Sequence, residues 1–371
     1  MAFRDVRRIV VKLGTSTVTR PDGTIHFGRV ERIVRQIVDV VNEGREVILV
    51  TSGAIGVGAS RLGLRRRPQT IPEKQAAAAV GQGLLMQAYE KLFAEYGRVV
   101  GQVLLTRADL AARDRFLNSR HTLLTLLAFG VVPIVNENDT VAVEELHFGD
   151  NDTLAALVAS LVGADIVILL SDVPGLFAQD PRRVPSAPLF DVVTEITAEI
   201  ERAAGGPGSA FARGGMATKL QAARVAVRAG IPLVLADGER PGVLAAILAG
   251  EREGTLFQPR PARLGSRKRW IAFHESPRGV IRVDAGAARA LVQDGKSLLP
   301  IGVIGVEGSF VAGDLVRICD DGGQELARGL VNYGAREIEK IMGARSDEIA
   351  GRLGHKAYDE VVHRDNLAVS V

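Results

Sequence analysis

Polar side chains that could hold a small substrate gather in residues 131–153. The stretch begins with an apolar, β-branched run at 131–135, which predicts a buried parallel strand, and it turns polar at 136–139. A second polar group at 149–153 precedes an apolar segment at 154–161, where a new helix would leave its first N–H groups unpaired. Ligands of open α/β sheets bind beyond the carboxyl ends of the strands, so these residues predict a substrate site, although a capped helix and a solvated loop would also explain them.

Two lysines lie where an anion could bind. Lys12 comes near the end of an apolar run that starts at Ile9, beside a turn whose N–H groups can approach an anion. Lys219 ends the segment 214–219, in which glycines open a helix that continues to about residue 229. The helix macrodipole adds to the charge of Lys219, so this segment is the better phosphate candidate, whereas a lysine at a strand end is usually solvated.

Two further strand ends carry polar residues. Ser52 follows the apolar run 47–50 and precedes a glycine-rich segment, 53–58, which allows either close approach to a ligand or tight helix packing. Asp172 follows the run 166–170 and could orient lysines, hold magnesium or form a turn. The glycine spacing G-x-x-G-x-G is not a dinucleotide fingerprint, and the sequence has neither a G-x-x-x-x-G-K-[ST] loop nor protein-kinase motifs. Any phosphoryl transfer must use another scaffold.

The composition disfavours several classes of protein. The 371 residues carry a net charge of +3, which is weak evidence for nucleic acid, and no apolar run approaches the roughly 20 residues that span a bilayer. The six histidines form no H-E-x-x-H motif or Cys/His cluster that would indicate zinc. Cys319 is the single cysteine, so an internal disulfide is excluded. The first residues lack the pattern of a secretion signal, and we expect a cytoplasmic protein with no membrane partner.

Strand-like and helical segments alternate over residues 9–257. The strands are short and apolar, and the stretches between them have apolar residues three and four apart. This alternation predicts an α/β domain, residues 1–257, with a mostly parallel sheet covered on both faces. The predicted strands are 9–13, 47–50, 99–105, 131–135, 166–170 and 233–236.

The character of the sequence changes after residue 257. Residues 258–275 are rich in proline, glycine and positive charge, which predicts a basic linker. Beyond it, short strand-like pieces with glycine turns predict a small β-rich domain and C-terminal tail over 276–371. Two short helices are expected in this domain, at 336–342 and 347–353.

Six motifs, in chain order, resemble the amino-acid kinase family, in the branch that phosphorylates free glutamate and carries a C-terminal PUA domain. They lie at residues 10–16, 50–55, 136–139, 148–152, 171–176 and 214–222. Residues 297–303, 308–310 and 313–316 resemble the PUA domain itself. The resemblance covers nearly the whole chain and implies an αβα sandwich with a mostly parallel central sheet, followed by a small β-rich domain.

The resemblance also implies a reaction. ATP, with Mg2+ held mainly by the nucleotide rather than by protein side chains, would phosphorylate the side-chain carboxylate of L-glutamate to L-glutamyl 5-phosphate, the first step of proline biosynthesis. Proline would inhibit the enzyme, and the chain would form a homo-oligomer, either a dimer or a tetramer. A carboxylate with a pKa near 4.3 is already ionised at pH 7, so it needs no general base, which agrees with the lack of an evident catalytic histidine.

Carried over by position, the resemblance assigns roles to site residues. The catalytic residues would be Lys12, Lys219 and Asp172. The nucleotide would contact Lys12, Ser171, Asp172, Arg213, Gly214, Gly215, Met216, Ala217, Thr218 and Lys219. Glutamate would contact Ser52, Asn136, Asp139, Asp150 and Asn151. Arg213 and Ala217 stand where related kinases often have Thr and Ser, so hydroxyl contacts are in question only at those two positions.

Two other functions stay open. PUA domains of other proteins bind RNA, and the basic segment 267–270 is compatible with an RNA-binding protein. The chain lacks the aromatic-studded sheet of sequence-reading RNA modules, so RNA is not the expected partner. The other alternative is a kinase of N-acetylglutamate, aspartate or a nucleotide, and the segments 136–139 and 149–152 favour free glutamate over these acceptors.

Overall fold

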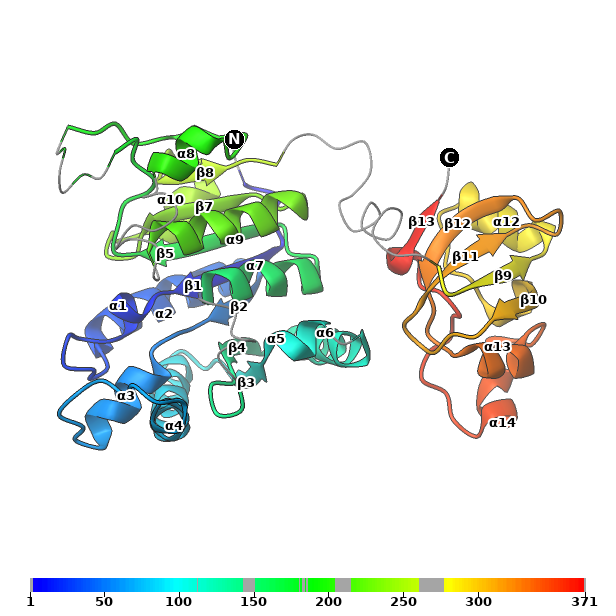
Figure 1. Cartoon of the computed structure of the whole chain (residues 1–371), viewed down its shortest axis with the longest axis horizontal. Coiled ribbons are helices and arrows are strands. Elements are labelled where there is room, and N and C mark those ends of the chain that lie inside the picture. Colours follow the sequence, from blue (N-terminus) through cyan, green and yellow to red (C-terminus); the bar gives the residue numbers. More distant parts are fainter. Residues whose placement is uncertain are drawn as a thin grey trace. The chain divides into compact units, whose positions relative to one another are not determined.

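The computed structural model contains two compact units, Met1–Pro261 and Ala262–Val371 (Figure 1). The structure describes residues 3–111, 113–142, 151–179, 181, 184, 186–203, 215–259 and 277–369. The predicted linker lies outside these residues from position 260 onward. Three predicted site residues, Asp150, Arg213 and Gly214, also lie outside them.

An eight-stranded sheet forms the centre of the first unit (Figure 1). Its strands are β1 (Arg8–Leu13), β2 (Glu46–Val50), β3 (Val100–Leu105), β4 (Val132–Glu137), β5 (Ile166–Ser171), β6 (Val192–Val193), β7 (Leu233–Asp237) and β8 (Thr255–Phe257). Their order is β3-β4-β2-β1-β5-β7-β8-β6, and each pairing between neighbours is parallel except that of β7 with β8. The mostly parallel sheet predicted from the sequence is confirmed.

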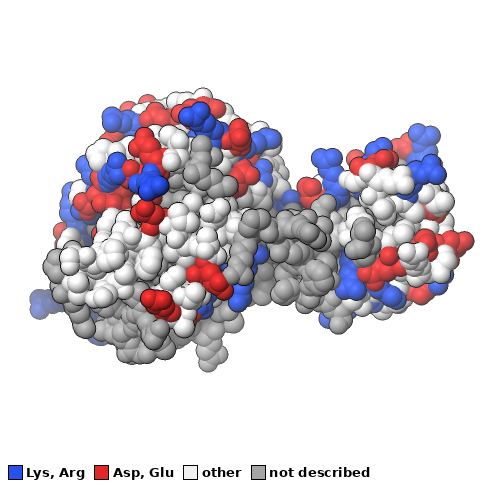
Figure 2. All heavy atoms as spheres, turned by 90° about the horizontal axis from the view of Figure 1, so that it is seen from above, with Lys and Arg blue, Asp and Glu red and all other residues white. Residues whose placement is uncertain are grey.

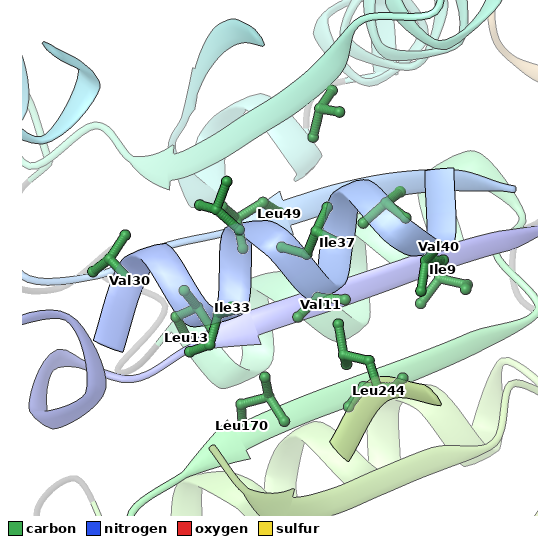
Figure 3. Close-up of a cluster of buried hydrophobic side chains, with 14 of the residues drawn as sticks. Ile9, Val11, Leu13, Val30, Ile33, Ile37, Val40, Leu49, Leu170 and Leu244 are labelled. Carbon is green, nitrogen blue, oxygen red and sulfur yellow. The ribbon is translucent and has the colours of Figure 1, made fainter. Parts of the chain in front are cut away.

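Helices cover both faces of this sheet. They are α1 (Thr15–Val18), α2 (Phe27–Asn42), α3 (Ala54–Arg61), α4 (Ile71–Ala94), α5 (Arg107–Ala111), α6 (Arg113–Ala128), α7 (Asn151–Val162), α8 (Ala198–Ala203), α9 (Met216–Arg228) and α10 (Val243–Ala249). On one face, alternate residues of β1 beginning with Ile9 share a core with α2 and α10 (Figure 3). On the other face, Val10 shares a core with α7 and α9. Because side chains alternate along a strand, Lys12 lies on the same face as Val10.

Two boundaries at the central polar stretch differ from the prediction. The strand β4 does not end at Val135 but continues through Asn136 and Glu137, which keep their pairing with β3. Asn136 can stay in the sheet because its buried side chain has amide partners. The helix α7 begins at Asn151, so Asn151 and Asp152 belong to its first turn rather than to a loop before it.

A five-stranded mixed sheet forms the second unit. Its elements are β9 (Gly279–Val283), α12 (Ala285–Val292), η3 (Pro300–Gly302), β10 (Val303–Gly308), β11 (Leu315–Cys319), β12 (Glu325–Leu330), α13 (Ala335–Ile341), η4 (Ser346–Glu348), α14 (Ile349–Leu353), η5 (Arg364–Asn366) and β13 (Leu367–Val369). The strand order is β10-β9-β11-β12-β13, with β9 and β11 parallel. The predicted small β-rich domain is confirmed, but α12 was not predicted. The sequence signal for the start of this helix is Asp284, whose side chain caps the helix by accepting the N–H of Ala287 at 2.7 Å.

The surface of each unit carries charges of both signs. Figure 2 shows Lys and Arg interspersed with Asp and Glu on the visible faces, in keeping with the small net charge of +3. Among the helices described, none combines the length and apolar character needed to cross a bilayer.

Helices α3 and α4 approach each other at two glycines. A Cβ atom added to Gly81 would lie 1.8 Å from the carbonyl oxygen of Ala54, and one added to Gly58 would lie 1.7 Å from that of Ala77. No real Cβ tolerates such distances, so the two backbones can meet only because both residues are glycine. This contact holds α4 beside α3, which closely follows the end of β2.

Gly81→Ala is expected to lower the free energy of unfolding by at least about 1–3 kcal/mol, because its methyl group would push the two helices apart. Gly83→Ala is the matched control, since the space around Gly83 on the same helix is open, and it is expected to stabilise by up to about 1 kcal/mol. Denaturant unfolding followed by circular dichroism measures both variants. Equal stability of the two would contradict the close helix contact.

Candidate active site

Two lysine side chains from distant parts of the first unit meet at one carboxylate. The Nζ atom of Lys12 lies 2.5 Å from Oδ1 of Asp152, and Nζ of Lys219 lies 3.1 Å from Oδ2 of the same residue. The side chain of Asp152 is 1% exposed and that of Lys12 is 4% exposed. The structure therefore brings together the two lysines that were predicted to bind an anion, and it places an aspartate between them.

Each of these three side chains is positioned by a regular element. Lys12 lies near the carboxyl end of β1, on the face that packs against α7 and α9. Asp152 lies in the first turn of α7, and Lys219 is the fourth residue of α9. Since α7 and α9 pack against each other, the starts of two helices converge on the end of one strand. This is the edge of an open sheet at which ligands bind.

The two lysines keep Asp152 ionised. Burial by itself would raise the pKa of Asp152, because it disfavours the charged form. The ammonium groups of Lys12 and Lys219 outweigh burial and lower this pKa below its ordinary value of 3.8. One negative charge thus holds two positive charges at neutral pH, and the remaining positive charge favours an anionic ligand.

A cluster of amides adjoins the charged trio. Nδ2 of Asn151 donates to the carbonyl oxygen of Thr51 at 2.6 Å and to Oγ of Ser52 at 3.0 Å. The same atom donates to Oδ1 of Asn136 at 2.8 Å. In turn, Nδ2 of Asn136 donates to Oε1 of Gln82 on α4 at 2.8 Å. Three predicted substrate residues, Ser52, Asn136 and Asn151, therefore lie in direct contact.

Predicted nucleotide residues lie at the end of β5 and the start of α9. Oγ of Ser171 donates to Oδ1 of Asp172 at 3.1 Å, and Asp172 is exposed. Gly215 is the N-cap of α9 and has no side chain to accept the first N–H groups of that helix. These N–H groups, next to Lys219, suit an anion. The first turn also contains Met216, Ala217 and Thr218.

The structure also places the remaining acidic residues of the prediction. Asp139 is half-buried in the turn after β4. Asp172 is predicted to orient lysines, hold magnesium or form a turn, and the acid that contacts both Lys12 and Lys219 in the structure is Asp152. Asp150 lies outside the described residues, as do Arg213 and Gly214.

Asp152 is not among the predicted site residues, although the sequence contains a signal for its burial. The helix α7 has eight of its 12 residues buried, including Asp152 in its first turn. A helix that is apolar on most sides is enclosed, so an acid at its start is enclosed as well. A buried carboxylate requires positive partners, and the two predicted lysines could supply them.

The donors of this site suit an anion better than a bare metal ion. Within the ranges that the structure describes, no group of three or more His, Cys, Asp or Glu residues could hold a metal. Ammonium groups and helix N–H groups bind anionic oxygens, whereas magnesium prefers oxygen ligands.

The strand order arranges these groups in a row along one edge of the sheet. The neighbouring strands β4, β2, β1 and β5 carry, at or just after their ends, Asn136, Ser52, Lys12 and Ser171. Adjacent strands lie about 4.8 Å apart, so the row spans roughly 14 Å. Two ligands placed end to end would meet amides at one end of the row and the lysines at its centre.

Fold and site together define an α/β enzyme that acts on phosphate-bearing ligands, and comparison with known families agrees. Residues 7–237 match the model of the Amino acid kinase family, and residues 279–353 match the PUA domain. The chain belongs to the amino acid kinase family, and its second unit contains a PUA domain.

Full-length relatives narrow this assignment. The glutamate 5-kinase of Moorella thermoacetica is 59% identical over 369 residues, which cover 100% of this chain and 98% of the relative. The glutamate 5-kinases of Carboxydothermus hydrogenoformans and Caldanaerobacter subterraneus subsp. tengcongensis are 53% and 52% identical, over 99% and 98% of this chain and 98% and 97% of the relatives. Within its family the chain therefore belongs with the glutamate 5-kinases.

Asp152→Asn is expected to lower the free energy of unfolding by about 3–5 kcal/mol at neutral pH, because two neighbouring ammonium groups lose their shared counter-charge. Folding lowers the pKa of Asp152, so its stabilising contribution is present above pH 3.8 and is lost as the pH falls below that value. The stability difference between wild type and variant should therefore be constant near neutral pH and shrink in acid. Urea unfolding at a series of pH values measures it.

Asp39→Asn, at an exposed position of α2, is the control and should not change the pH dependence. A wild type and an Asp152→Asn variant of equal stability at neutral pH would contradict the ion trio. A difference that persisted unchanged far below pH 3.8 would contradict the lowered pKa.

Proposed function

We propose that this chain transfers the terminal phosphoryl group of ATP to the side-chain carboxylate of L-glutamate, giving L-glutamyl 5-phosphate and ADP at the entry to proline biosynthesis. The main support is the pair of lysines on Asp152, next to a cluster of amides, in a chain 59% identical to a glutamate 5-kinase. The relatives support glutamate and ATP as substrates, and the geometry supports our assignment of residues to each of them.

The transfer needs no proton to be removed. A carboxylate oxygen of glutamate attacks the γ-phosphorus, the new O–P bond forms, and the bond to the oxygen that bridges to the β-phosphorus breaks as ADP leaves. The attacking carboxylate is already ionised at neutral pH. The main obstacle is therefore the repulsion between one anion and another, together with the alignment of the two reactants.

The lysine pair is suited to this obstacle. Lys12 and Lys219 lie between the amide cluster and the nucleotide residues, where the phosphoryl group would pass. Asp152 holds both ammonium groups in place before the substrates arrive, so little reorganisation accompanies the reaction. Helix N–H groups at the start of α9 add partial positive charge.

The two ends of the row would hold the two substrates. Ser52, Asn136 and Asn151 would bind glutamate, with Asp139 pairing with its ammonium group and Asp150 close by. Ser171, Asp172 and the segment 213–219 would bind ATP, which brings Mg2+ with its phosphates. The proposal also includes inhibition by proline, assembly as a dimer or tetramer, and a cytoplasmic location. The family resemblance and the glutamate 5-kinase relatives support these three properties.

A coupled assay of ADP release over a panel of acceptors tests the function. We expect release to depend on L-glutamate, to be much weaker with aspartate or N-acetylglutamate, and to fall when proline is added. Release that required one of the other acceptors would overturn the assignment of glutamate. A salt-dependent RNA gel shift with no acceptor-dependent ADP release would favour an RNA-binding function instead.

Lys12→Met and Lys219→Met are each expected to lower kcat at least about 100-fold, because each removes charge stabilisation from the transition state. Steady-state kinetics with varied ATP and varied glutamate measure the effect. Lys91→Met, at an exposed position of α4, is the control and should retain the wild-type constants. A raised KM for ATP with an unchanged kcat would show that the lysines only bind the nucleotide.

Asp139→Ala is expected to raise the KM for glutamate about 10- to 100-fold, because the ammonium group of the substrate would lose a charged partner. The KM for ATP should stay close to that of the wild type. Initial rates at saturating ATP give the comparison, with Asp39→Ala as a control at an exposed acid. An unchanged KM for glutamate would rule out this role for Asp139.

A further inference from the structure

Gln82 has a buried donor that the described structure leaves unused. The residue lies on α4 and is only 8% exposed, and its Oε1 accepts the hydrogen bond from Asn136. Its Nε2 atom is buried and has no hydrogen-bond partner among the residues described. Buried donors are nearly always paired in folded proteins, so this one requires an explanation.

The orientation of the amides follows from two backbone groups. The carbonyl oxygen of Thr51 can only accept, so the atom of Asn151 that faces it is Nδ2. The backbone N–H of Glu137 can only donate, so the atom of Asn136 that receives it, at 2.9 Å, is Oδ1. Nδ2 of Asn136 therefore faces Gln82, and the atom of Gln82 that accepts its N–H must be Oε1. The unused group of Gln82 is therefore its N–H donor.

Of these three amide nitrogens, only Nε2 of Gln82 has no acceptor among the residues described. The amide nitrogen of Asn151 contacts three acceptors, and that of Asn136 is directed at Gln82. The helix α4 also reaches the end of β2, because the hydroxyl group of Tyr89 lies 2.7 Å from that of Thr51. Gln82 and Tyr89 are seven residues apart and so share one face of α4. This face contacts Asn136 through Gln82 and Thr51 through Tyr89.

We propose that Gln82 is a further residue of the glutamate site, where Oε1 positions Asn136 and Nε2 donates to a carboxylate oxygen of the bound amino acid. This inference rests on the proposed function. An ammonium group has no lone pair to accept from Nε2, so the substrate's amine cannot be its partner. A neutral donor can bind a carboxylate without drawing Lys12 or Lys219 away from the phosphates.

Two variants separate the two roles of Gln82. Gln82→Met removes both, and it is expected to raise the KM for glutamate about 10- to 100-fold while the KM for ATP changes less than about threefold. Gln82→Glu keeps an oxygen for Asn136 but sets a carboxylate against that of the substrate. It should therefore be impaired at least as much as Gln82→Met, and more so when the pH is raised by about two units and the buried acid ionises.

Gln87→Met and Gln87→Glu, at an exposed position of the same helix, are the matched controls and should keep the wild-type KM. Thermal unfolding verifies that each variant is folded. A Gln82→Glu enzyme with the wild-type KM for glutamate at every pH would overturn the donor role, since it would show that Gln82 only supports Asn136. A wild type without glutamate-dependent ADP release would overturn the proposed function, whereas an active wild type with unaffected Gln82 variants would overturn this inference alone.

Discussion

The carboxylate of Asp152 lies between two ammonium groups, in a place where none of the three charges would be stable alone. Burying a single lysine or aspartate in a sheet-and-helix core is costly, and two lysines placed side by side would also repel each other. The acid offsets both effects, because each of its two carboxylate oxygens contacts the Nζ atom of one lysine, at 2.5 and 3.1 Å. The positive charge that a triphosphate requires can therefore be assembled before any nucleotide binds.

Asp152 also links the two halves of the site, since its neighbour in sequence is Asn151. Consecutive residues in the first turn of α7 direct one side chain to the lysines and the other to the amides at the ends of β2 and β4. The two clusters cannot shift independently while that turn is intact. In the proposed reaction, the alignment of the acceptor carboxylate with the phosphoryl group would therefore depend on this first turn of α7.

Much of this arrangement could be predicted from the sequence, because it depends on local patterns. Apolar β-branched runs predicted the strands, and Lys12, Ser52 and Asn136 were expected at the strand ends for that reason. The burial of Asp152 has a signal in the sequence, but its contacts with Lys12 and Lys219, and that of Gln82 with Asn136, depend on how α7, α9 and α4 pack and do not follow from local patterns. The end of β4 was also placed too early, because a polar residue usually ends a buried strand unless tertiary contacts satisfy it, as they do for Asn136.

A crystal structure of the enzyme with glutamate and a non-hydrolysable ATP analogue would test the central claim most directly. The account predicts that the Nζ atoms of Lys12 and Lys219 lie about 2.7–3.0 Å from oxygens of the β- and γ-phosphates, while Asp152 remains between them. The side-chain carboxylate of glutamate should point at the γ-phosphorus from the side of Asn151. A triphosphate bound beyond the reach of both lysines, or a glutamate bound away from Asn136 and Asn151, would contradict it.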